Sequence, residues 1–159
     1  MGVDTRTGYA DERELATAVT ERLGRRQIAA AESCTAGRIG AALAGVPDAT
    51  NSLRGVLVAY QTGVKRSLLG VATEGVLSRQ AAEQMAQGAA TLFDAHVTVS
   101  TTGLAGGEPD EGVDPGTVFV ATFVDGHCTS REHHFDGDPD DVCDQAARRA
   151  LLDLLADLG

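Results

Sequence analysis

Two short stretches of this chain contain three side chains that could together supply a nucleophile and the base that activates it. Lys65 is the only lysine among 159 residues, whereas arginine occurs twelve times. Arginine keeps its proton in proteins, but a lysine removed from water can lose it and act as a base. Tyr60 lies five residues before Lys65, and Ser33 follows a short apolar segment. A serine with a lysine base and a nearby tyrosine is a workable set for acyl transfer without histidine.

The residues around Ser33 have the pattern of a strand that ends where a helix begins. Such a junction directs backbone N–H groups and the positive end of the helix dipole at one spot, where they can hold an oxyanion. Ser33 is then the first candidate nucleophile. Cys34 is the second, because a helix N-terminus lowers the pKa of a thiol. However, no pairing of a histidine with an asparagine that could activate Cys34 is visible in the sequence. The alternative is that Ser33 and Thr35 only cap the helix.

A third stretch, residues 100–107, also follows a predicted strand and is rich in glycine. Small residues let the backbone approach a phosphate or a planar ring closely. The stretch has neither the Gly-Lys-Ser/Thr of a Walker loop nor the GxGxxG spacing of dinucleotide-binding folds. A plain turn is therefore the alternative here, just as an exposed lysine on a helix surface is the alternative for Lys65.

Hydrophobic spacing predicts the elements that position these residues. Helices are expected over 11–23, 35–44, 62–69, 78–93 and 140–158, and strands over 27–31, 56–60, 96–101, 117–123 and 129–135. Gly70 is a natural helix end, Ser78 is a helix cap, and Asp125 followed by Gly126 predicts a tight hairpin turn. Helices interleaved with short buried strands indicate a three-layer α/β/α sandwich, in which ligands bind at the carboxyl ends of strands.

Composition narrows the class of protein. Hydrophobic residues make up 43% of the chain, so we expect one globular domain over 11–159 after a flexible segment over 1–10. A net charge of −10 argues against a general nucleic-acid binder, which must neutralise phosphates. No apolar run has membrane-spanning length and no signal peptide is evident, so a cytoplasmic protein is expected. Three widely spaced cysteines, Cys34, Cys128 and Cys143, indicate reduced thiols.

Two further patterns mimic metal sites without fitting one. Asp136, Asp138 and Asp140 correspond to the first ligands of a calcium loop, yet Asp141 stands where that loop needs glycine. Two adjacent histidines at 133 and 134 fall on a predicted strand, so their side chains should point to opposite faces. The sequence predicts neither a metal site nor a cofactor.

Several motifs in one order resemble the C-terminal domain of the CinA family, the nicotinamide-nucleotide amidohydrolases (NMN deamidases). The motifs are 31–37 (AESCTAG), then Tyr60 and Lys65 with 69–71 (LGV), 75–78 (GVLS), 102–106 (TGLAG) and 116–118 (GTV). The resemblance spans roughly residues 12–155. It implies a three-layer fold with a mixed, mostly parallel sheet. It also implies hydrolysis of the carboxamide of nicotinamide mononucleotide to nicotinate mononucleotide and ammonia, without a metal.

The same resemblance implies residue roles. Ser33 would be the nucleophile, Lys65 its base, and Tyr60 would assist proton transfer or orient the lysine. Backbone N–H groups around Cys34, Thr35 and Gly37 would hold the oxyanion or the phosphate. The other substrate-binding residues would be Glu32, Thr102, Gly103, Ala105 and Gly106. The expected partner is a small pyridine mononucleotide, and a homo-oligomer is expected from the family.

The chain departs from the family pattern in ways that keep two alternatives open. Ala36 replaces a usual glycine, and the acidic residues of 136–141 stand where the family has arginines. One alternative is an amidase for a different amide that lacks a phosphate. The other is a non-catalytic ligand-binding or partner protein that has kept the pocket.

Overall fold

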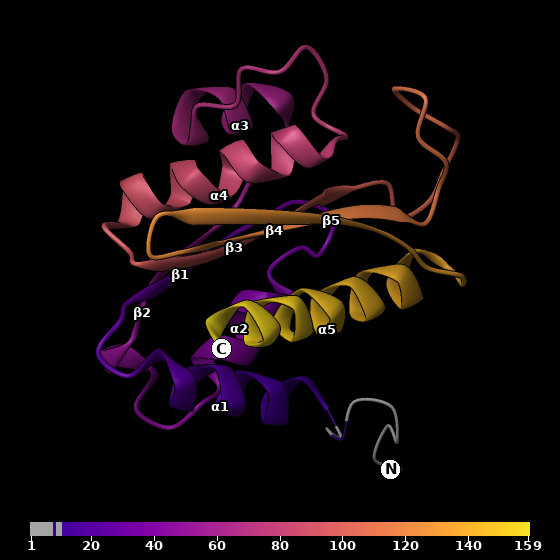
Figure 1. The fold of residues 1–159 in the computed structure, drawn as a ribbon. Coiled ribbons are helices and arrows are strands. Elements are labelled where there is room, and N and C mark those ends of the chain that lie inside the picture. The colour runs from indigo at the N-terminus through magenta and orange to yellow at the C-terminus, as the bar shows by residue number, and fades with distance from the viewer. Residues whose placement is uncertain (1–7, 9–10) are drawn as a thin grey trace.

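A five-stranded sheet lies between two layers of helices in the computed structural model, which describes residue 8 and residues 11–159 (Figure 1). The helices are α1 (Glu12–Leu23), α2 (Arg38–Ala44), α3 (Thr62–Leu69), α4 (Arg79–Phe93) and α5 (Pro139–Leu158), with a 3-10 turn at Ala49–Asn51. The strands are β1 (Ile28–Glu32), β2 (Leu53–Val58), β3 (Val97–Gly103), β4 (Thr117–Val124) and β5 (His127–His134). The three-layer α/β/α sandwich expected from the sequence is confirmed. The flexible segment expected over 1–10 lies outside the described residues, apart from residue 8.

The sheet is mixed, and its strand order is β2-β1-β3-β4-β5. Strand β1 is parallel to both neighbours, whereas β4 is antiparallel to β3 and to β5. Only β4 therefore runs against the common direction, which agrees with the expected mostly parallel sheet. From β1 the chain goes first to β2 on one side and later to β3 on the other. In open α/β sheets, ligands bind at the carboxyl ends of the strands at such a switch point.

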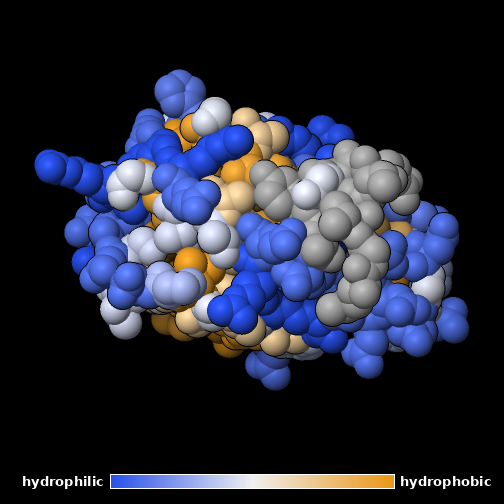
Figure 2. Space-filling model, turned by 90° about the horizontal axis from the view of Figure 1, so that it is seen from below, coloured by the Kyte–Doolittle hydropathy of each residue, from blue (hydrophilic) through white to orange (hydrophobic). Residues whose placement is uncertain are grey.

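Each face of the sheet has its own apolar core. Helices α1, α2 and α5 bury residues such as Leu15, Ile39 and Leu151 against one face, and α3 and α4 bury residues such as Leu69 and Met85 against the other (Figure 1). Seen from the α1 side, the surface is mostly hydrophilic, with apolar residues showing in its middle (Figure 2). No helix in the described part of the chain is long and apolar enough to cross a membrane.

The bounds of α3 and the start of α4 agree with those expected from the sequence. Helix α3 occupies 62–69 and ends at Gly70, whose φ of 70° is a left-handed conformation that glycine adopts without strain. The Ser78 side chain caps α4 by accepting from the Ala81 amide at 3.1 Å. The hairpin turn falls at Asp125 and Gly126, both with positive φ, as a two-residue turn between twisted strands requires.

Two predicted boundaries are wrong by several residues. Helix α2 begins at Arg38 instead of Thr35, because Ala36 and Gly37 have φ values of 53° and 92° and cannot belong to a right-handed helix. Strand β2 covers 53–58 instead of 56–60. Its extent is set by pairing with β1, which runs from Ile28 opposite Leu53 to Glu32 opposite Val58. Tyr60 therefore lies beyond the strand, in the connection to α3.

Candidate active site

The carboxyl ends of β1, β2 and β3 meet at one edge of the sheet and form the floor of a cavity. The Ser33 amide donates to the carbonyl oxygen of Thr101 at 3.1 Å, and the Ala59 amide donates to that of Glu32 at 2.7 Å. These bonds continue the sheet pairing just past the end of β1, so Ser33 is held rigidly at the edge. The cavity has a volume of about 590 Å³. Its wall includes all three candidate catalytic residues, Ser33, Tyr60 and Lys65.

Lys65 reaches this cavity from α3, which sits directly on α4. A Cβ added at Gly88 of α4 would lie 2.0 Å from the Leu69 carbonyl oxygen, so only glycine permits this approach. The Lys65 side chain is 3% exposed. Its ammonium makes no hydrogen bond or ion pair with another described residue. Burial therefore lowers the pKa of Lys65, while the nearby Cys34 and Glu111 oppose that change.

The three candidate catalytic residues differ in exposure. Ser33 is buried, at 6% exposure, whereas Tyr60 is 63% exposed and stands at the cavity rim. No hydrogen bond joins Ser33 to Lys65 among the described residues. Proton transfer between them thus needs one bridging water or a small closure of the cavity when the substrate binds. In sites without a ligand, catalytic hydrogen bonds are commonly longer than in the complex.

Glu32 is fully buried directly before Ser33, and its carboxylate holds the start of α2. It accepts from the amides of Ile39 at 3.0 Å and Gly40 at 2.9 Å, and from the Thr35 hydroxyl at 2.6 Å. The helix amides expected to hold an oxyanion are therefore bound by Glu32. Three amides earlier in the turn, those of Cys34, Thr35 and Gly37, donate to no other described residue.

Cys34 lines the same cavity, but its thiol is not activated. Burial, together with the nearby Cys143, raises the pKa of Cys34 to about 12, although Lys65 acts in the opposite direction. The lowered thiol pKa expected from a helix N-terminus is wrong, because α2 begins four residues later and its first amides are neutralised by Glu32. Cys143 donates its S–H to the Cys34 carbonyl oxygen at 2.8 Å.

The residues predicted to bind substrate fall into two groups. Cys34, Gly103, Ala105 and Gly106 line the cavity. Glu32, Thr35, Gly37 and Thr102 do not, and their place is in the supporting structure. The Thr102 hydroxyl donates to the Val76 carbonyl oxygen at 2.7 Å, and the Thr35 hydroxyl bonds that of Thr101 at 2.8 Å. These bonds tie β3 to the turn after β1 and to the connection before α4.

Charged residues that the sequence did not single out for the site also line the cavity: Arg38, Asp110, Glu111 and Asp140. Glu111 accepts from the amides of Val76 at 3.2 Å and Leu77 at 2.8 Å. This contact folds the loop over 104–116 onto the connection between α3 and α4, beside Lys65. Loop residues carry no periodic signal, so nothing in the sequence pattern indicates these contacts.

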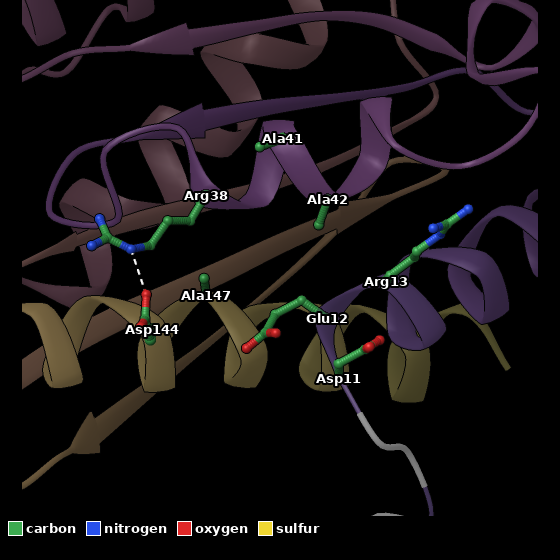
Figure 3. A pocket seen from close by; sticks show the side chains of 8 residues that line it. All are labelled: Asp11, Glu12, Arg13, Arg38, Ala41, Ala42, Asp144 and Ala147. Atoms are coloured by element: carbon green, nitrogen blue, oxygen red, sulfur yellow. Dashed lines mark hydrogen bonds and ion pairs between the residues drawn. The ribbon is translucent and has the colours of Figure 1, made fainter. Parts of the chain in front are cut away.

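Arg38 also borders a second cavity, of about 410 Å³, between the start of α1, α2 and α5. Figure 3 shows its guanidinium directed at Asp144 of α5, while Arg13 of α1 points away. The Nε atom of Arg38 donates to Asp144 at 2.6 Å. Arg38, which is paired with Asp144, thus lies between the two cavities.

The comparisons with known proteins agree on one family. The family model described as the CinA C-terminal domain matches residues 12–158. A CinA-like protein of Thermotoga neapolitana is 35% identical over 138 residues, which is 82% of this chain and 33% of that protein. The chain thus corresponds to about a third of that relative's length.

Solved structures agree along nearly the whole chain. The CinA superfamily protein from Enterobacter cloacae has a TM-score of 0.91 at 28% identity, covering 100% of this chain and 99% of that one. The competence/damage inducible protein CihA from Agrobacterium tumefaciens has a TM-score of 0.85 at 33% identity, covering 92% of this chain and 95% of that one.

Proposed function

This chain belongs to the CinA C-terminal domain family, and on that premise we propose that it is an amidohydrolase. The proposed reaction is hydrolysis of the carboxamide of nicotinamide mononucleotide to nicotinate mononucleotide and ammonia. The observation that carries the proposal is Lys65, a buried lysine without a bonding partner among the described residues, in the wall of the cavity that holds Ser33. Burying an unpaired ammonium is costly unless the group can be neutral or meets a ligand.

The proposed mechanism uses two acyl-transfer steps. Neutral Lys65 accepts the Ser33 proton as Oγ attacks the carboxamide carbon, and the amide of Cys34, which lines the cavity and donates to no other described residue, is the donor available for the oxyanion. Collapse breaks the C–N bond, and Lys65 returns the proton to the leaving ammonia. Water, deprotonated by Lys65, then attacks the Ser33 ester, and Lys65 passes that proton to Ser33 Oγ as the C–O bond breaks, which releases the acid that ionises to the carboxylate. Tyr60 at the rim assists proton transfer or orients Lys65 once a substrate covers it.

Ammonia release from nicotinamide mononucleotide tests these roles. Ser33→Ala and Lys65→Ala should each lower kcat by at least about 100-fold, the usual contribution of a nucleophile or a general base. Lys65→Arg should be nearly as damaging, because arginine keeps its proton. Arg66→Ala is the matched control, since Arg66 is an exposed cation on the same helix that does not line the cavity. Equal, non-zero rates in all variants would contradict the roles, and no release by the native protein would contradict the substrate.

A non-catalytic ligand-binding protein is the competing function, and the missing Ser33–Lys65 hydrogen bond is the observation in its favour. A fluorophosphonate probe distinguishes the two. An activated Ser33 should gain the mass of the probe, and this labelling should be lost in Lys65→Ala. An unlabelled native protein would favour the non-catalytic function.

A further inference from the structure

We propose that Asp140 and its neighbouring carboxylates make this cavity select pyridinium nucleosides without a phosphate over their phosphorylated forms. The proposal rests on the proposed function for the reaction and ranks its substrates: the mononucleotide is hydrolysed, but the nucleoside without a phosphate is preferred. The charged side chains that line the cavity are Arg38, Lys65, Asp110, Glu111 and Asp140. Carboxylates thus outnumber cations in the cavity wall, whereas a site for a phosphate dianion is favoured by an excess of cationic donors.

Neither cation in the wall offers a phosphate an unshared positive charge at the cavity mouth. Arg38 donates from Nε to Asp144 at 2.6 Å, from Nη2 to Asp140 at 3.2 Å, and from Nη1 to the Thr35 carbonyl oxygen at 3.4 Å. Figure 3 shows the guanidinium aimed at α5. Each of its three nitrogens thus already donates once, so a phosphate that reached the remaining N–H groups would share the guanidinium charge with two carboxylates. Lys65 is buried at the reaction centre beside Ser33, where the carboxamide must lie.

Two acidic segments border the cavity. The loop over 104–116 and the segment over 136–147 contain nine aspartates and glutamates and no lysine or arginine, and three of these carboxylates, Asp110, Glu111 and Asp140, line the cavity. The two segments touch, because a Cβ added at Gly106 would lie 2.6 Å from Cγ of Pro139 at the start of α5. Carboxylates gathered around a low-dielectric cleft attract cations and repel dianions. A pyridinium ring carries a fixed positive charge, so its nucleoside is favoured and its 5′-phosphate is opposed.

The test compares nicotinamide riboside with nicotinamide mononucleotide as substrates at low ionic strength. The native protein should show a kcat/KM at least about tenfold higher for the riboside, the size expected for one unscreened charge interaction near a protein surface. Asp140→Asn should lower this ratio about tenfold, because it removes one carboxylate and releases Nη2 of Arg38. The change should lie mainly in the KM for the mononucleotide, and added salt should lower the native ratio by screening.

Asp48→Asn is the matched control, since Asp48 is an exposed carboxylate before β2, at the opposite edge of the sheet. A native ratio of one or less overturns the proposal, as does an equal effect of Asp140→Asn and Asp48→Asn. Calorimetric binding of both compounds to Ser33→Ala separates this outcome from failure of the proposed function. Tighter binding of the riboside supports the charge selection even without ammonia release. Tighter binding of the mononucleotide, or no binding of either, overturns it.

Discussion

Lys65 should leave its signature in the pH dependence of the reaction. As a general base it must be neutral, so kcat/KM should rise with pH through the pKa of Lys65. Burial lowers that pKa, so the rising limb should have its midpoint below the ordinary lysine value of about 10.4. The measurement is a pH profile of kcat/KM for ammonia release, limited to the pH range in which the fold is intact.

Glu111→Gln gives this profile a second, directional test. Glu111 raises the pKa of Lys65, so its neutralisation should move the rising limb to lower pH while an amide oxygen remains to accept from Val76 or Leu77. Glu108→Gln is the control, because Glu108 lies in the same loop but not in the cavity wall. A limb that stays in place in Glu111→Gln, or moves equally in both variants, would show that another group sets the profile.

The sequence pattern predicted Ser33, Tyr60 and Lys65 as one set, and the structure indeed brings them around one cavity. That prediction is possible because strand ends in a parallel sheet converge, so residues after separate strands become neighbours. Glu111 and Arg38 could not be found in this way. Their contribution depends on how one loop folds back and on which carboxylates an arginine meets, and neither has a period or a motif.

Helix α2 depends on a single buried side chain for its N-terminus, and this dependence is testable. Glu32→Ala would leave the amides of Ile39 and Gly40 without their acceptor, while the Thr35 hydroxyl could still donate to that of Thr101. Since each unsatisfied buried group costs about 1–3 kcal/mol, the free energy of unfolding should fall by at least about 2 kcal/mol. Glu32→Gln should cost less, because one oxygen acceptor remains. Urea denaturation monitored by circular dichroism measures both.

Asp11 provides the comparison, because it caps α1 at the surface by accepting from the Glu14 amide at 2.9 Å. Asp11→Ala should cost only about 1 kcal/mol, the usual loss for an exposed cap. Equal losses for Asp11→Ala and Glu32→Ala would contradict a special role for Glu32. The positive φ values of Ala36 and Gly37 delay the start of α2 to Arg38, and a carboxylate from the preceding strand then satisfies its first amides. Hydrophobic spacing cannot reveal such a cap, whereas Ser78 lies within the ordinary cap spacing of α4 and was predictable.

Helix α5 joins the two ends of the molecule. Its first residues, Pro139, Asp140 and Cys143, line the cavity at the carboxyl edge of the sheet. Its last turn lies near the opposite edge, where Asp157 forms two bonds with Arg131 of β5, at 2.6 and 2.8 Å, and accepts from Thr122 of β4. Twenty helical residues cover about 30 Å. Charge at one end of α5 should therefore affect ligand choice, and charge at the other end should affect stability.

Asp157→Asn should separate these two effects. The hydrogen bonds from Arg131, followed by that from Thr122, hold the pKa of Asp157 below its ordinary value. A lowered carboxyl pKa contributes stability above the unfolded value of about 3.9, and this contribution disappears as pH falls through the folded value. At pH 7, Asp157→Asn should therefore cost about 1–2 kcal/mol, because the pair is partly exposed to solvent.

Below about pH 4 the difference from the native protein should begin to shrink, because the unfolded carboxyl then binds a proton that the Arg131-paired carboxyl does not, and it should approach zero only below the lowered pKa of the folded state. Urea denaturation at pH 7, 5 and 3.5 measures this convergence. The riboside-to-mononucleotide ratio should stay at its native value in Asp157→Asn, whereas Asp140→Asn should change the ratio with little loss of stability. A destabilisation by Asp157→Asn that persists undiminished at pH 3.5 would mean that packing, and not the Arg131 pair, holds the end of α5 to the sheet.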